Sequence, residues 1–162
     1  MPDLDNELRQ LLAGKKTVIM GVGNPERGDD AFGALLSEKI RSSDKMVSIT
    51  CEELPENYTG VAKAENPNVV LFIDAVDFGG SEGDLILVNS DALKSDRFSS
   101  HRPSLKLVMD YLSAETRAAV YLLGVQPGTT NFGKYLGEKI RETLSHLLAL
   151  FSDIQKDNQK EA

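Results

Sequence analysis

Residues 17–40 read TVIMGVGNPERGDDAFGALLSEKI, and this stretch decides the fold class. An apolar run enters a glycine-rich turn, the turn ends in the acid pair Asp29 and Asp30, and a helical apolar pattern follows. A strand, a glycine turn and a helix in this order are typical of α/β proteins, many of which hold a phosphate in the turn. Two carboxylates would repel a phosphate, so the sequence first raises the question of what this turn binds.

The rest of the chain continues the alternation of apolar strands and amphipathic helices. Strands are expected at residues 16–22, 46–53, 68–76, 83–89 and 118–125, and helices at 4–14, 32–40, 55–66, 103–114 and 133–151. Continuous apolar strands between helices predict a mostly parallel sheet that is covered on both faces. A single domain, 1–162, accommodates all of them, and its polar tail 155–162 is expected to fray.

One connection departs from the parallel pattern. Only Ala75–Gly83 separates the third and fourth expected strands, whereas a parallel crossover needs about a dozen residues or more. The fourth strand is therefore expected to be antiparallel and to lie at or near an edge, while the first and third strands are expected to be neighbours. The predicted fold is α/β, a three-layer sandwich with a twisted, mostly parallel five-stranded sheet, one antiparallel strand and helices on both faces.

The composition argues against several classes of function. The chain has 162 residues, and 18 basic against 25 acidic side chains give a net charge of −7, so nucleic acid is not an expected partner. Its one cysteine, Cys51, permits neither an intrachain disulfide nor a CxxC metal site. The N-terminal segment lacks the apolar core of a signal peptide, and the longest apolar run, VVLFI, is too short to cross a membrane. We expect a cytoplasmic monomer without membrane insertion.

The glycine turn does not fit the known nucleotide fingerprints. Gly21 and Gly23 would need a third glycine at position 26, which is Glu26, and the Lys-Ser/Thr pair of a P-loop is missing. A nucleotide-binding module is therefore the weaker alternative, which nucleotide protection against thermal unfolding would revive. We expect this turn to hold a cation or a positively charged substrate.

Polar side chains gather where the expected strands end. Asp29 and Asp30 follow the first strand, Asp74 and Asp77 end the third, and His101 precedes the helix that leads into the fifth. Doubly wound sheets bind their ligands at this edge, so these side chains are expected to share one crevice. One imidazole with two carboxylates is a donor set that suits an open nickel or zinc site.

Simpler interpretations apply to several of these positions. One of Asp29 and Asp30 is expected to cap the following helix, which leaves the other for chemistry. Asp77 is expected to shape the turn before the glycine pair, whereas Asp74 has the stronger functional claim because a buried carboxylate is costly unless it is paired. Solvated or helix-face positions without a chemical role are expected for Glu52, Glu53 and His146.

Five segments, taken together and in order, resemble the hydrogenase maturation endopeptidases: GVGNPERGDDAFG, PEN, FIDAVDFGGSEGDL, SSHRPSL and LLGVQP. The similarity spans nearly the whole chain and is strongest to the members that serve hydrogenase 3, the formate hydrogenlyase. It implies a twisted mixed sheet between layers of helices. It also implies an enzyme that removes a short C-terminal extension from the large-subunit precursor of a [NiFe]-hydrogenase after nickel insertion.

The same resemblance assigns nickel recognition to Asp30, Asp74 and His101. Nickel is then expected to arrive with the precursor, and other divalent ions are expected to occupy the site in vitro. One departure concerns the position ahead of PEN, where family members carry a glycine pair and this chain reads Cys-Glu-Glu-Leu. Glu52 and Glu53 are expected to narrow or recharge the rim there, which bears on which precursor is preferred.

The mechanism and one non-enzymatic alternative stay open at this point. A metal held by Asp30, Asp74 and His101 would activate water directly. Alternatively, the carboxylates would act as general base and acid, as in an aspartyl endopeptidase. A non-catalytic chaperone that senses nickel in the hydrogenase precursor would use the same three residues, and time-dependent cleavage distinguishes it from an enzyme.

Overall fold

The computed structural model describes the chain except for residues 1, 95–97, 101, 103, 129–134 and 161–162. Its central sheet has the strand order β2-β1-β3-β6-β4 and is formed by β1 (Thr17–Val22), β2 (Met46–Glu52), β3 (Val69–Asp77), β4 (Leu85–Val88) and β6 (Ala119–Val125). The first four of these in spatial order are parallel, and β4 pairs antiparallel with β6 at the edge. The predicted five-stranded sheet, its antiparallel edge strand and the β1–β3 neighbourhood are confirmed.

A two-residue strand, β5 (Ser99–Ser100), adds one short antiparallel pairing that the sequence did not predict. It pairs with the end of β3, where Val76 faces Ser100 and Asp77 faces Ser99. This pairing holds Ser99 and Ser100 against the carboxyl end of β3. It therefore lies at the edge of the sheet where the candidate site is found.

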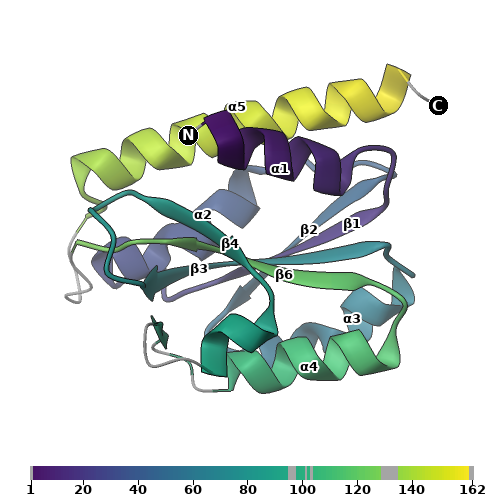
Figure 1. Ribbon diagram of the computed structural model, residues 1–162, viewed down its shortest axis with the longest axis horizontal. Helices are drawn as coiled ribbons and strands as arrows, with labels where there is room; N and C mark the ends of the chain where they lie inside the picture. The colour runs from purple at the N-terminus through teal and green to yellow at the C-terminus, as the bar shows by residue number, and fades with distance from the viewer. Residues whose placement is uncertain (1, 95–97, 101, 103, 129–134, 161–162) are drawn as a thin grey trace.

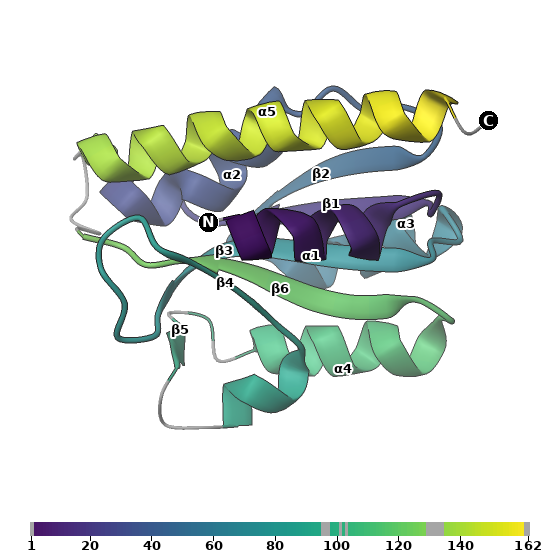
Figure 2. The same ribbon diagram turned by 45° about the horizontal axis from the view of Figure 1, so that its top comes forward.

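Helices cover both faces of the sheet (Figures 1 and 2). On one face lie α1 (Pro2–Leu12), α2 (Phe32–Lys39) and α5 (Glu138–Lys160), and on the other lie α3 (Thr59–Ala64) and α4 (Leu105–Glu115). Short 3-10 helices connect these elements at η1 (Gly28–Ala31), η2 (Pro55–Tyr58) and η3 (Ser90–Lys94). The three-layer α/β sandwich is therefore confirmed. Among the described residues, no helix combines the length and apolar character needed to cross a bilayer.

The two cores follow from the two-residue period of the strands. Ile19 packs with Phe32 in the core beneath α1, α2 and α5, whereas its neighbours Val18 and Met20 belong to the core beneath α4. Successive side chains of a strand point to opposite faces, so a strand covered on both faces must be apolar at every position. All six residues of β1 are buried, as this rule requires.

The C-terminal helix is longer than predicted. The tail expected to fray is helical as far as Lys160, where α5 ends. Asn158, which is buried, accepts a hydrogen bond from the Gly14 backbone N–H at 2.8 Å and donates to the Leu12 carbonyl at 3.4 Å. The polar side chain at position 158 thus satisfies backbone groups at the end of α1, and this contact between distant segments corrects the expectation of a frayed tail.

Candidate functional site

The candidate site lies where the carboxyl ends of β1 and β3 meet. These strands pair in parallel, with Gly21 opposite Ile73, so the residues that follow each strand start from the same edge of the sheet. After β1 the chain reverses direction through η1, which carries Asp30. Asp74 lies in the C-terminal half of β3. Two carboxylates that are distant in sequence therefore share one crevice.

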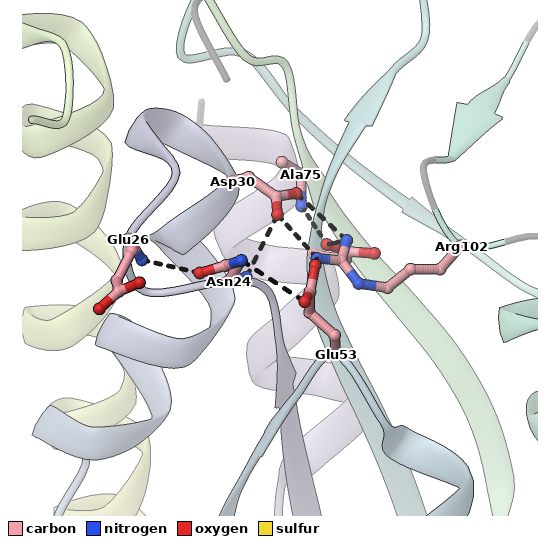
Figure 3. A network of polar contacts seen from close by, with 7 residues as sticks. Asn24, Glu26, Asp30, Glu53, Ala75 and Arg102 are labelled. Carbon is pink, nitrogen blue, oxygen red and sulfur yellow. Dashed lines mark hydrogen bonds and ion pairs between the residues drawn. The ribbon is translucent and has the colours of Figure 1, made fainter. Parts of the chain in front are cut away.

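The guanidinium of Arg102 joins the carboxylates of Asp30 and Asp74, and Figure 3 shows its contact with Asp30. Arg102 Nη1 donates to Asp74 Oδ1 at 2.8 Å and to Asp30 Oδ1 at 3.2 Å, and Arg102 Nη2 donates to Asp30 Oδ2 at 2.8 Å. Asp30 thus receives a two-pronged contact, the geometry in which arginine binds a carboxylate most strongly. In this structure the positive charge that faces Asp30 is the Arg102 side chain, and the expectation that the turn holds a bound cation or a positively charged substrate stays a prediction.

Burial makes this cluster electrostatically unusual. The side chains of Arg102, Asp30 and Asp74 are 6%, 5% and 0% exposed. Burial raises the pKa of the Asp74 carboxyl from 3.8 to about 7, although Arg102 opposes the rise. Between these two values the folded protein holds a proton that the unfolded chain releases, so this group's contribution to stability falls as the pH rises through that interval.

The charge on Arg102 survives its burial. Burial alone would lower the pKa of the guanidinium, but the attraction of Asp74 and the hydrogen bond to Asp30 outweigh it and raise the pKa above its ordinary value. Arg102 is therefore a fixed positive charge between the two carboxylates. Because the guanidinium does not lose its proton, its positive charge can leave this position only if the Arg102 side chain moves.

Asn24 holds Asp30 and links it to the rim of the crevice (Figure 3). Its backbone N–H donates to Asp30 Oδ2 at 3.2 Å, its side-chain oxygen accepts from the Glu26 N–H at 2.9 Å, and its Nδ2 donates to Glu53 Oε2 at 3.4 Å. Glu53 is half exposed, and its Oε1 lies 3.9 Å from Arg102 Nη2. The carboxylate cluster is thus continuous with an acidic rim.

A surface pocket of about 510 Å³ opens beside this rim. Asn24 and Glu53 belong to its wall, together with Pro25, Glu26, Cys51, Glu52, Leu54, Asn57 and Tyr58. Burial raises the pKa of the Cys51 thiol to about 12, so the thiol is uncharged near neutral pH and is a poor nucleophile.

The other member of the acid pair, Asp29, has a structural task. Its carboxylate is fully buried and accepts the Gly128 N–H at 2.8 Å and the Gly137 N–H at 2.9 Å. Neither Asp29 nor Asp30 caps the helices that follow the turn, because η1 and α2 begin without a side-chain cap. The expectation of a capping aspartate is wrong: one carboxylate joins both ends of segment 128–137 to the glycine turn, and the other binds Arg102.

Replacing Asp29 by asparagine is expected to lower the free energy of unfolding by about 1–3 kcal/mol. An amide offers one oxygen, so the –NH2 group would face one of the two backbone N–H donors at Gly128 and Gly137. Urea unfolding of the variant measures the loss, with Asp44→Asn as the control because Asp44 is exposed in the turn before β2. Equal stability of Asp29→Asn and the control would contradict this structural task.

A second set of hydrogen bonds shapes the turn after β3. Gln126 Oε1 accepts the N–H groups of Phe78 at 2.9 Å and Gly80 at 3.1 Å, and Gln126 Nε2 donates to Asp77 Oδ1 at 3.0 Å. Asp77 Oδ1 also accepts the Gly79 N–H at 3.1 Å, so the prediction that Asp77 is a turn residue is confirmed. Gln126 comes from the LLGVQP segment. Its hydrogen bonds hold the turn that follows β3, the strand that carries Asp74.

The remaining predicted positions divide into confirmed and untested ones. Glu52 and Glu53 are exposed as expected, although Glu53 also approaches Arg102. His146 lies on the surface of α5 and contacts Asp5 Oδ1 at 2.9 Å. Glu52 has a φ of 51°, a left-handed conformation that glycine adopts without strain, at a position where the resemblance implies glycine. His101, the expected third metal ligand, lies outside the described residues.

Asp30 and Asp74 are the described members of the predicted metal site. Within the part of the chain that the structure describes, no three His, Cys, Asp or Glu side chains gather as a metal site. Asp74 Oδ2 is buried and has no hydrogen-bond partner there, so one carboxylate oxygen lacks a donor. Two carboxylates, one of them with an oxygen that lacks a donor, fit a divalent cation, and a third donor would have to come from another segment.

Sequence reasoning missed Arg102. The SSHRPSL segment drew attention through its histidine, and the adjacent arginine carried no pattern of its own. One signal was present: two carboxylates expected in one buried crevice require a compensating positive charge.

Comparisons with known proteins agree with the fold. A family model described as "HycI: Hydrogenase maturation protease" matches residues 54–153. The curated hydrogenase 3 maturation protease of Escherichia coli K12 is 28% identical over 130 residues, which cover 78% of this chain and 83% of that protein.

Two solved structures extend the likeness to three dimensions. The crystal structure of a [NiFe] hydrogenase maturation protease HycI from Thermococcus kodakarensis KOD1 is 35% identical, with a TM-score of 0.83, and the match covers 93% of this chain and 99% of that one. The solution structure of the endopeptidase HycI from Escherichia coli is 26% identical, with a TM-score of 0.74, and the match covers 91% and 92%.

Proposed function

This chain belongs to the hydrogenase maturation protease family, and from that premise we propose that it removes a C-terminal extension from the large-subunit precursor of a [NiFe]-hydrogenase once nickel has been inserted. Endopeptidase activity in hydrogenase maturation follows from the family. The precursor as substrate and nickel as the signal for cleavage form our proposal. Nickel is here part of the substrate and arrives with the precursor.

The convergence of Asp30 and Asp74 on one cation carries this proposal. The two buried carboxylates contact the same nitrogen, Arg102 Nη1, at 3.2 and 2.8 Å, so they are close enough to bind one cation together. They lie at the carboxyl edge of neighbouring parallel strands, which is where α/β proteins bind their ligands. We assign nickel recognition to Asp30 and Asp74, and to His101 as the third donor.

The chemistry proposed for this site is hydrolysis by water. Cys51 is an uncharged buried thiol, so a thioester intermediate is not proposed. A carboxylate of the Asp30–Asp74 pair takes a proton from the attacking water, whose oxygen bonds to the carbonyl carbon of the peptide bond to be cut. The same group then gives the proton to the leaving amine nitrogen as the C–N bond breaks, and nickel bound in the precursor would orient that bond beside the pair. The backbone N–H of Asn24 holds Asp30 in place for this role. The adjoining pocket offers room for the extension to bind along the acidic rim.

Cleavage is expected only when the precursor carries nickel. The enzyme is stripped with chelator, the chelator is removed, and nickel-loaded or nickel-free precursor is added with no free metal. Intact-mass spectrometry should show a time-dependent loss of mass from the C-terminus of the nickel-loaded precursor and none from the nickel-free precursor. A pair of carboxylates without a thiolate has modest affinity for metal, so the stripped enzyme meets nickel only when the precursor carries it.

Two results would contradict this proposal. Cleavage of the nickel-free precursor at the same rate would remove nickel as the signal. Activity that returns only after the enzyme itself has been reloaded with nickel would make it a metalloprotease with its own metal. A precursor that binds stably but never loses mass would indicate a chaperone.

A further inference from the structure

Arg102 occupies the position in which a cation would bind both carboxylates. Its Nη1 contacts Asp30 Oδ1 and Asp74 Oδ1, and the side chain is 6% exposed. A divalent metal ion bridging the same oxygens would lie about 2.0–2.2 Å from each of them. The nitrogen and the ion therefore cannot be present together.

We propose that Arg102 is an internal competitor that keeps free divalent ions away from Asp30 and Asp74 until the precursor docks. This inference rests on the proposed function, in which the same pair recognises nickel in the substrate. A free ion must displace three charge-assisted hydrogen bonds with nothing but its own coordination. A docked precursor contributes the binding energy of its whole contact surface in addition to the coordination of its nickel. That additional energy displaces the guanidinium from the two carboxylates.

The structure also provides a place for the displaced side chain. Glu53 Oε1 lies 3.9 Å from Arg102 Nη2, and its side chain is 51% exposed, so the guanidinium can turn toward the rim and still face a carboxylate. Asn24 donates to Glu53 and keeps this second carboxylate beside the first. Arg102 therefore has an inner position between Asp30 and Asp74 and an outer partner in Glu53.

The identity of the side chain matters for this task. A guanidinium presents several N–H donors in a planar fork, so Arg102 contacts two carboxylates at once. A lysine ammonium is a compact point charge and would hold fewer of these oxygens. Arg102→Lys should therefore retain the charge but weaken the competition.

Direct titration of the substrate-free protein with Ni²⁺ alone tests the inference. Isothermal titration calorimetry of Arg102→Gln should show at least tenfold tighter binding than wild type, and Arg102→Lys should lie between them. Arg27→Gln is the matched control, because Arg27 is exposed in the same glycine turn and its loss changes the net charge equally. Its affinity should stay within about twofold of wild type, since exposed charges are screened by salt.

Wild-type protein provides a second measurement that needs no variant to fold. In nitrogen-15 arginine NMR, the Arg102 guanidinium protons should exchange slowly in the free protein and lose that protection when diamagnetic Zn²⁺ saturates the carboxylates. Should Arg102→Gln fail to fold, this experiment and Arg102→Lys carry the test.

Three outcomes would overturn the inference. They are a gain below tenfold in Arg102→Gln, an equal gain in Arg27→Gln, and protection of the Arg102 protons that persists in the metal-saturated protein. These measurements use free enzyme and free metal, so their failure is distinct from failure of precursor cleavage. A tight-binding Arg102→Gln together with a wild type that never cleaves precursor would confirm the competition and refute the proposed function.

Discussion

Substitution of Asp30 or Asp74 by asparagine is expected to lower the rate of precursor cleavage about a thousandfold. Asparagine keeps the shape of the side chain but removes the charge that binds a cation and the basic oxygen that takes a proton. Asp30 has both oxygens engaged by Arg102, and Asp74 is fully buried, so both carboxylates are held inside the crevice, whereas the nearest other carboxylate, Glu53, lies on its exposed rim. Single-turnover cleavage of nickel-loaded precursor, followed by mass spectrometry, measures the loss.

The fold of these two variants is expected to survive. Arg102 keeps one carboxylate partner in each, and an amide at position 74 suits the buried site because burial already disfavours the charge of Asp74. Far-UV circular dichroism and the melting temperature serve as the check on folding. Asp29→Asn is the informative neighbour: at a temperature where it is folded it should cleave far better than Asp30→Asn. Equal cleavage by the two variants would mean that the acid pair is structural.

Gly33→Ala is expected to lower the free energy of unfolding by more than about 3 kcal/mol. A Cβ atom at Gly33 would lie 2.2 Å from the carbonyl oxygens of both Val22 and Ile73. Those are backbone atoms of β1 and β3, the two strands at the centre of the site, so relief requires α2 to move off the sheet. A loss of this size corresponds to a melting temperature roughly 10 °C lower in a chain of this length.

Gly60→Ala is the matched control for that prediction. Gly60 lies in the first turn of α3, and nothing within 4 Å would meet its added Cβ. Alanine favours helix over glycine, so this variant should be unchanged or up to about 1 kcal/mol more stable. Urea unfolding of both variants decides the matter. If the Gly33→Ala variant has the same urea midpoint of unfolding as wild type, the close approach of α2 to the sheet is not required for stability.

Much of the fold could be predicted because the relevant signals are local. An unbroken apolar run indicates a strand buried on both faces, and the short Ala75–Gly83 connection excludes a parallel crossover. These two signals were enough to place β1 beside β3 and β4 at the antiparallel edge. They also placed Asp30 and Asp74 at one edge of the sheet, because the carboxyl ends of parallel strands coincide.

The tertiary structure alone decided which partner each charged group received. Asp30 and Asp74 meet Arg102, which lies 72 and 28 residues away, and Asp29 binds backbone groups 99 and 108 residues away. Whether an aspartate caps a helix, binds a distant loop or faces a guanidinium depends on which donors the folded chain brings within hydrogen-bond distance. The five main strands, the edge of the sheet that carries the site and the need for a positive charge there could be predicted from the sequence, since periodicity and connection length are properties of neighbouring residues. Only tertiary packing decides that Arg102 supplies this positive charge. Burial removes water as an alternative partner, so each carboxylate binds the nearest donor that the folded chain places beside it.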